Sequence, residues 1–226
     1  MAIGDHLSDV KVLWGVAGCS NTSKILLTAA EKGVDIDGRS VDVNSEVEMN
    51  EVRKVSPFGS IPVLKDVDFY IYGTEAIMSY LDDKGFGNSL IPRNGVARAL
   101  NYQWAHIAST AFAPAVSKLT DGDDSAMEVV KQSLTALEAQ LNARTKRGDY
   151  IVGEFSLADI HWAPSIHALC LNGHESLVDS MPGVKAWWGN MKVRKSMSKE
   201  DYVAYTVLPS LDEIRSNKIR SVSINV

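Results

Sequence analysis

The segment Ser56-Pro-Phe-Gly-Ser-Ile-Pro-Val-Leu64 places a proline at the beginning of a predicted strand. Residues 61–65 and 68–71 have the composition of two short strands joined by a tight turn. Pro62 has no N–H group to donate, so it cannot occupy a regular position in a central strand. A proline on an edge strand is the ordinary explanation of such a residue.

The residues on both sides of this segment predict an α/β domain. Strands are expected at residues 10–14 and 39–43, and helices at residues 24–32, 45–55 and 75–83. The helix-boundary signals are a Ser45/Glu48 capping box, Thr74 as an N-cap, and Gly33 and Gly85 as helix ends. The order β-α-β-α-β-β-α predicts a mixed sheet with helices packed on it.

The chain changes character at residues 86–92, where glycine and proline indicate a linker. Helices are predicted beyond it. One long helix spans residues 93–119 with a kink at Pro114, and later helices begin after a Ser125/Glu128 capping box, at Ser156 and at Pro182. The predicted domains are therefore an α/β domain, residues 1–85, and an all-helical domain with a C-terminal tail, residues 93–226.

The composition excludes several classes of protein. The 226 residues carry 23 basic and 28 acidic side chains, a net charge of -5 without a basic block, so no nucleic-acid partner is expected. No apolar run approaches the ~18 residues of a membrane-spanning helix, and the N-terminus lacks a secretory-signal pattern. Two cysteines, Cys19 and Cys170, predict neither a disulfide framework nor a metal site. We expect a cytoplasmic protein that binds no metal and no membrane.

Three segments of the chain resemble the glutathione transferase superfamily. The proline segment quoted above is similar to N-P-x-G-x-V-P-x-L. Gly73-Thr-Glu-Ala-Ile-Met-Ser-Tyr-Leu81 is similar to E-S-x-A-I-x-x-Y-L, and Tyr150-Ile-Val-Gly-Glu-Phe-Ser-Leu-Ala-Asp-Ile160 is similar to G-D-x-x-S-x-A-D. The resemblance implies a thioredoxin-like N-terminal domain, a helical glutathione-transferase-type C-terminal domain and a homodimer.

In that superfamily the proline that corresponds to Pro62 is cis and exposes the backbone of the residue before it. The resemblance therefore places Ile61 and Pro62 at a thiol-binding site, where Ile61 pairs its backbone with an extended peptide-like ligand. The implied co-substrate is glutathione or another small thiol. Ser156 and Asp159 form a helix cap, and we expect them to have a folding role and no catalytic one.

The superfamily places the ligand's sulfur at the N-terminus of the first helix, where partial positive charge favours a thiolate. Residues 18–24 are similar to the T-P-N-G-x-K motif of nu-type members and to the G-A-N-S-x-K motif of bacterial β-etherases. Asn21 matches the asparagine of both motifs and is the first candidate for stabilising the thiolate, followed by Ser20 and Thr22. Cys19 is a rival nucleophile, although threonine at position 22 leaves no Cys-x-x-Cys pair.

At the other end of the thiol site the sequence departs from the superfamily pattern. The resemblance places Thr74 on the serine that binds the ligand's carboxylate, but Gly73 stands where an acidic residue binds the ammonium group. Glu75 lies one residue further and is expected to point elsewhere. An unpaired ammonium group costs ~1–3 kcal/mol. Three explanations stay open: an acid from elsewhere, weak glutathione binding, or a different small thiol.

The second substrate of the superfamily binds against the fourth helix. Tyr102, His106 and Ala113 are spaced to lie near one face of that predicted helix and are the expected electrophile-pocket residues. His106 has the chemistry of a general acid or base near neutral pH, but a packing role is the simpler interpretation.

The expected activity is transfer of an activated thiol to an aromatic or conjugated electrophile, or a β-etherase-type cleavage or sulfur-transfer step with the same nucleophile. Two alternatives remain at this point. The first is a thiol-binding protein without catalytic activity, which the missing acid at Gly73 favours. The second is a thiol transferase that depends on Cys19.

Overall fold

A computed structural model of the chain describes residues 10–143, 148–197, 212, 215 and 216. The described residues fall into two compact units, one of residues up to 87 together with those from 195 onward, and one of residues 88–194. The boundary after Gly87 lies within the predicted linker. Residues 195–197 group with the first unit, whereas the sequence assigned them to the helical domain. Ser196 explains the difference, because its hydroxyl donates a hydrogen bond to the Glu31 carboxylate. The strand-like pattern expected at residues 220–226 lies outside the described residues.

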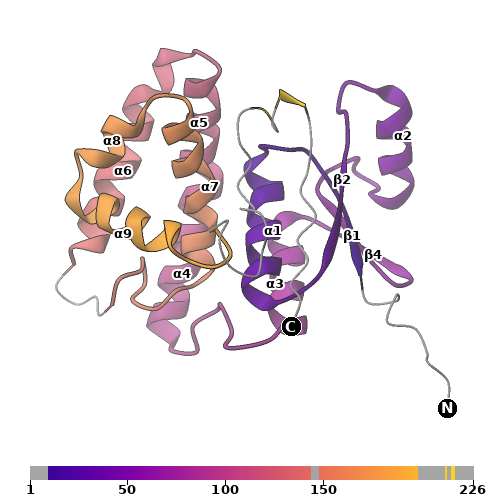
Figure 1. Ribbon diagram of the computed structural model, residues 1–226, viewed down its shortest axis with the longest axis horizontal. Helices are drawn as coiled ribbons and strands as arrows, with labels where there is room; N and C mark the ends of the chain where they lie inside the picture. The colour runs from indigo at the N-terminus through magenta and orange to yellow at the C-terminus, as the bar shows by residue number, and fades with distance from the viewer. Residues whose placement is uncertain (1–9, 144–147, 198–211, 213–214, 217–226) are drawn as a thin grey trace. The chain divides into compact units, whose positions relative to one another are not determined.

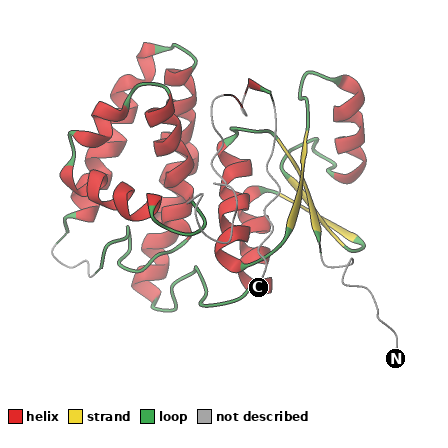
Figure 2. Cartoon of the chain, viewed as in Figure 1, coloured by secondary structure: helices red, strands yellow, loops and turns green. Residues whose placement is uncertain are grey.

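The first unit is a mixed sheet of four strands in the order β2-β1-β3-β4. The strands are β1 (Lys11–Gly15), β2 (Ile36–Ser40), β3 (Val63–Asp66) and β4 (Phe69–Tyr72). β1 and β2 are parallel, and the other two pairs are antiparallel. The helices α1 (Ser20–Lys32) and α3 (Thr74–Lys84) pack together on one face, and α2 (Glu46–Val55) covers the other (Figures 1 and 2). The element order is the predicted one, and the unit is thioredoxin-like.

Local signals account for the helix ends in this unit. Gly33 adopts the left-handed conformation (φ 63°) that closes α1, and its N–H donates to the Ala29 carbonyl. The Ser45 side chain caps α2 by accepting from the Glu48 N–H. The Glu48 carboxylate accepts from the Asp42 N–H at 2.8 Å, so the second half of the predicted box is made with another residue.

The second strand lies three residues earlier than the sequence predicted, at 36–40 instead of 39–43. Its parallel pairing with β1 sets this position, with Lys11 opposite Ile36 and Gly15 opposite Ser40. Ile36 is buried, but the Asp37-Gly38 pair that follows is not typical of a strand, so the sequence pattern did not predict a strand here. The sequence pattern favoured the alternating residues beyond it, whose last part leads into α2.

The second unit is helical throughout its named elements. They are α4 (Gly95–Ile107), the π-helix η2 (Ala108–Phe112), α5 (Ala113–Thr120), the 3-10 helix η3 (Asp124–Ala126), α6 (Met127–Leu141), α7 (Leu157–Leu171), α8 (Glu175–Asp179) and α9 (Pro182–Lys192). The single long helix predicted at 93–119 is interrupted by η2, just before Pro114. A proline has no N–H for the regular α-helical ladder, and a π turn is one local solution. The short α8 was not predicted.

Two predicted caps have different outcomes. Ser156 and Asp159 form a complete capping box at the start of α7, as predicted. Ser125 does not cap a helix with Glu128. The Asp123 carboxylate is the cap instead, at the start of η3, where it accepts from the Ser125 N–H at 3.0 Å.

The core of this unit forms around the buried ring of Trp162, which stacks on Phe112 with centroids 4.5 Å apart and donates to the Trp104 carbonyl.

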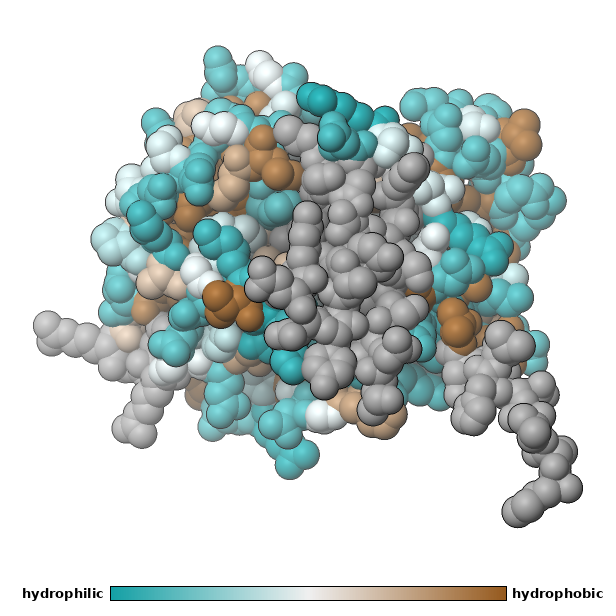
Figure 3. Space-filling model, viewed as in Figure 1, coloured by the Kyte–Doolittle hydropathy of each residue, from teal (hydrophilic) through white to brown (hydrophobic). Residues whose placement is uncertain are grey.

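The face drawn in Figure 3 is mainly polar, with separate apolar spots among the described residues. Within the described ranges, no helix has the length and apolar character that crossing a membrane would require. Those same residues contain no cluster of three or more His, Cys, Asp or Glu side chains suited to a metal ion.

Candidate functional site

One end of the sheet gathers the segments that the sequence singled out. Val63, the first residue of β3, lies opposite Trp14 near the end of β1 and opposite Tyr72 at the end of β4. The chain leaves β1 toward α1 and leaves β4 directly into α3. The N-termini of both helices therefore lie at the same end of the sheet as the Ile61–Pro62 bond. This strand register therefore brings the three segments of the candidate site to one end of the sheet.

The peptide bond between Ile61 and Pro62 is cis, as the resemblance implied. β3 lies between β1 and β4, so Pro62 does not belong to an edge strand. It stands immediately before the first ladder residue of a central strand, which is how the sheet accommodates a residue without an N–H group. The edge-strand explanation is therefore wrong. Pro62 is buried and Ile61 is half-buried.

Gly73, and not Thr74, is the N-cap of α3, which corrects the prediction that Thr74 caps this helix. Thr74 is the first helical residue and is buried. The N-cap backbone has φ 93° and ψ 123°, a conformation that glycine adopts readily and other residues do not. This geometry explains why the N-cap is glycine. In the sequence pattern alone, Gly73 was notable only because an acidic residue is missing there.

Replacing Gly73 by alanine should lower the free energy of unfolding by about 1–3 kcal/mol through backbone strain. A methyl group here would meet no atom within 4 Å, so crowding contributes nothing. Gly95→Ala is the matched control, since this glycine also has open space around its Cβ position but no positive φ. Urea unfolding should show a loss for the first variant alone. Equal stabilities would contradict the strained conformation.

The four thiol-end candidates have different environments at the start of α1. Cys19 is the N-cap and is half-buried, and its side chain makes no capping hydrogen bond. The Ser20 hydroxyl is buried and has no hydrogen-bond partner among the described residues. Thr22 is buried, and its hydroxyl accepts from the Val16 N–H at 3.1 Å, which fixes the β1–α1 loop. Asn21 is exposed.

Lys24 falls on the lysine of both first-helix motifs, but the sequence reasoning gave it no role. Its side chain is fully buried, and its ammonium group donates to the Asn21 carboxamide oxygen at 3.3 Å. Burial lowers the pKa of Lys24 from 10.5 to about 8, and the nearby Glu75 carboxylate and Cys19 side chain act on that pKa in the opposite direction. A lysine at the head of an otherwise apolar run was the available signal, because such a residue inside a buried helix needs a partner.

Glu75 lies within electrostatic reach of Lys24. It is exposed on the first turn of α3, yet its charge raises the pKa of Lys24 on α1. The predicted orientation of Glu75 away from the ligand stays a prediction. The packing of α3 against α1 brings its carboxylate within electrostatic reach of the thiol end.

The lowered pKa of Lys24 predicts a pH-dependent stability. Between pH 8 and 10.5 the unfolded chain keeps a proton that the folded chain has lost, so raising the pH favours the folded state. Relative to Lys24→Met, the wild type should gain about 2 kcal/mol between pH 8 and pH 10. Urea unfolding at both pH values measures this difference. A gap between the two proteins that does not change with pH would contradict it.

The predicted electrophile-pocket residues are only partly brought together. Tyr102 and His106 are exposed on α4, one turn apart, whereas Ala113 is half-buried and begins α5. The π-helix η2 between them breaks the α-helical period on which the grouping of all three depended.

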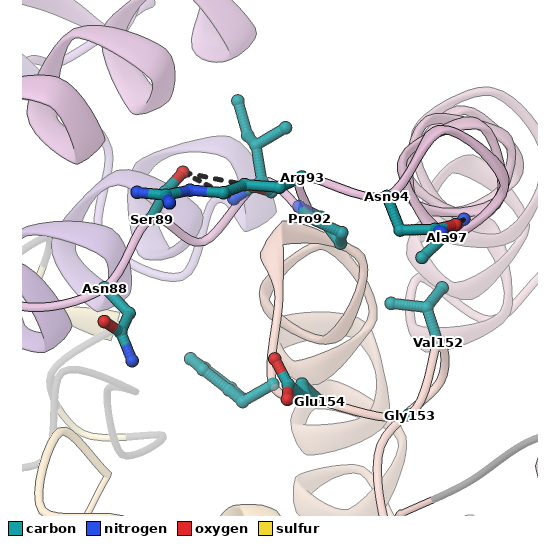
Figure 4. Close-up of a pocket in the computed structure, with 11 residues that line it drawn as sticks. Asn88, Ser89, Pro92, Arg93, Asn94, Ala97, Val152, Gly153 and Glu154 are labelled. Atoms are coloured by element: carbon teal, nitrogen blue, oxygen red, sulfur yellow. Dashed lines mark hydrogen bonds between the residues drawn. The ribbon is translucent and has the colours of Figure 1, made fainter.

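Two of the cavities that the described residues line contain no predicted site residue. One, of about 520 Å³, is lined by residues 88, 89, 91–94, 97 and 152–155 of the helical unit. Figure 4 shows Asn88 and Ser89 on one side of it and Gly153 and Glu154 on another. The other, of about 510 Å³, has an apolar floor with Val41, Val52 and Val63 between the sheet and α2.

Comparisons with known proteins follow the same two-part division. The model of the glutathione S-transferase N-terminal domain matches residues 18–84, and that of the C-terminal domain matches residues 105–208. Glutathione S-transferase F14 of Arabidopsis thaliana is 31% identical over 206 residues, which cover 83% of this chain and 79% of the relative.

Two solved structures resemble the fold. Glutathione transferase F7 from Populus trichocarpa has a TM-score of 0.71 and 28% identity, over 82% of this chain and 95% of that one. Glutathione S-transferase-I bound with lactoylglutathione has a TM-score of 0.72 and 25% identity, with the same two coverages. None of these three relatives bears a nu-type or β-etherase name.

Proposed function

The chain belongs to the glutathione S-transferase family, and from this premise we propose that it conjugates glutathione to aromatic or otherwise conjugated electrophiles. The observation that carries the proposal is the common position of the two helix N-termini and the cis Ile61–Pro62 bond at one end of the sheet. A peptide-like thiol has a place there for its backbone, its carboxylate and its sulfur.

The proposed reaction begins at the start of α1 with transfer of the thiol proton to solvent water. The N-terminus of this 13-residue helix favours negative charge, and the Asn21 amide group donates to the thiolate. Ser20 has a hydroxyl without a partner among the described residues, which makes it the second donor candidate. The thiolate then attacks the electrophilic carbon, forming a carbon–sulfur bond as a leaving group departs or an unsaturated bond is opened.

The rest of glutathione is proposed to bind along the same end of the sheet. Ile61 pairs its backbone with the cysteinyl segment, next to Pro62. The Thr74 hydroxyl and the N-terminus of α3 receive the γ-glutamyl carboxylate. Glu75 is the nearest acid in sequence to Gly73 and takes the place of the missing ammonium partner. Of the three explanations left open by the sequence, we therefore favour an acid from elsewhere.

The test pairs a conjugation assay with a titration. Glutathione and 1-chloro-2,4-dinitrobenzene should give a conjugate, and the ultraviolet absorbance of enzyme-bound glutathione should show a thiol pKa below its solution value. A bound thiol that titrates at its solution value, without conjugation, would instead identify the non-catalytic binding protein.

A second candidate function rests on Cys19. It is the half-buried N-cap of α1, and it lies within electrostatic reach of the Lys24 ammonium group. A thiol transferase built on Cys19 would lose its activity in Cys19→Ser and would transfer glutathione to and from disulfides. Full conjugation activity in that variant removes this candidate.

The remaining expectations from the sequence concern the subclass of enzyme, the oligomeric state, the electrophile contacts and the location. Two of the relatives named above are plant glutathione transferases with F designations, so we propose conjugation of this kind in place of the nu-type or β-etherase-like chemistry expected from the first helix. We also propose a homodimer, supported by Phe58, which is 82% exposed and packs edge-on against Tyr72. Tyr102 and His106 remain proposed electrophile contacts, and the cytoplasmic location stays a prediction.

A further inference from the structure

The side chains of Asn21 and Lys24 form a pair on the first turns of α1. They are three residues apart and so lie on the same side of the helix. The lysine is fully buried and the asparagine is exposed, so the pair connects the interior of the unit to its surface. The ammonium nitrogen lies 3.3 Å from the carboxamide oxygen of Asn21.

The chemistry of the two groups fixes the orientation of the carboxamide. An ammonium group only donates hydrogen bonds, so the asparagine must offer it the oxygen. The amide nitrogen carries both donor hydrogens, and these are then not used by Lys24. Without Lys24 the carboxamide can turn over and present its oxygen, an acceptor that repels a thiolate.

We propose that Lys24 is a positioning residue, which holds the Asn21 carboxamide by its oxygen and turns the amide N–H groups toward the sulfur of the bound thiol. This inference rests on the proposed function, because it concerns the same thiolate. Lys24 acts through Asn21 and does not touch the substrate. Cys19 on α1 and Glu75 on α3 also act on Lys24 electrostatically, and neither requires the carboxamide to have one orientation.

The first experiment compares wild type with Lys24→Met, which keeps the length of the buried side chain and removes the donor. The pKa of bound glutathione should rise by about one unit, and kcat at pH 6.5 should fall about tenfold with the thiolate fraction. KM for glutathione should change less than twofold. Lys24→Gln is the second variant, since its neutral amide can still donate to Asn21 and should restore most of kcat.

Lys32→Met is the matched control. This lysine lies on the same helix, is equally buried, and pairs with Asp82 at 3.0 Å instead of with a candidate site residue. Its loss should lower the stability and leave the pKa of bound glutathione at the wild-type value. If Lys32→Met shifts that pKa as much as Lys24→Met does, the effect of Lys24 is a general one of helix packing and the proposal is overturned.

A double-mutant cycle separates positioning from the direct effect of a positive charge. If Lys24 acts through Asn21, the double variant Asn21→Ala/Lys24→Met should have the same thiol pKa and kcat as Asn21→Ala. Additive effects would overturn the proposal in favour of direct electrostatic action. A wild-type enzyme that neither conjugates nor lowers the pKa of bound glutathione refutes the proposed function itself, which is a different result from an unchanged Lys24 variant.

Discussion

Asp159→Ala should lower the free energy of unfolding by about 3–6 kcal/mol, a large part of the 5–15 kcal/mol typical of a folded domain. The carboxylate is fully buried and accepts from the Ile151 N–H at 3.0 Å, the Ser156 N–H at 2.9 Å and the Trp187 indole N–H at 2.8 Å. Alanine leaves these donors buried without an acceptor. The same carboxylate joins the beginning of α7 to α9, so both elements should loosen together.

Urea unfolding followed by tryptophan fluorescence and by circular dichroism measures this loss. Asp123→Ala is the control, because Asp123 also caps a helix but is exposed. Its loss should be much smaller, because an exposed N-cap side chain leaves donors that water can satisfy. Similar losses in the two variants would mean that burial adds nothing to the Asp159 cap. Glutathione binding by the folded fraction of Asp159→Ala should be retained, since the cap has no part in the chemistry.

Asn21→Ala should lower kcat/KM for glutathione conjugation about 10- to 100-fold at pH 6.5, the effect of removing one hydrogen bond to a charged group. The loss should shrink at higher pH, because the thiolate then forms without help. The pKa of bound glutathione should rise in parallel toward its solution value. Initial rates from pH 6 to pH 9 and ultraviolet titration of the complex provide the two measurements.

Cys19→Ala is the control for this experiment, since it changes the N-cap of α1 and leaves the Asn21–Lys24 pair in place. Its conjugation rate should stay within a few-fold of the wild type. The reverse outcome, an inactive Cys19 variant beside an active Asn21 variant, would identify the protein as the cysteine-dependent transferase. An unchanged rate in both variants would transfer the role to the Ser20 hydroxyl.

Much of the fold could be predicted because its signals are local. The Gly33 helix end and the Ser156–Asp159 box are satisfied within a few residues of the chain, so their spacing determines them. The proline at position 62 marked the beginning of β3 for the same reason. The helix interrupted by η2 was harder, because a proline shows where a helix is disturbed but not which turn replaces it.

The position of β2 and the cap of α3 could not be predicted in the same way. β2 takes its register from β1, and that pairing outweighs the alternating pattern of residues 39–43. Gly73 acquires its role from a backbone conformation that only the junction of β4 and α3 imposes. Both depend on contacts between elements, which an amphipathic pattern does not record.

The sequence by itself determined the order of the elements in the first unit, the cis-proline segment and the family, because these reside in residue types and short spacings. Only the tertiary structure decided that Lys24 is buried, that it holds Asn21, and that Glu75 of α3 acts on it. Every side chain from Thr22 to Ala30 is buried. This stretch of α1 has no exposed polar face, so the sequence pattern could not show whether Lys24 faces solvent or the interior. The packing of α1 with α3 brings these charges together, so their proximity depends on the tertiary structure and not on their spacing in the sequence.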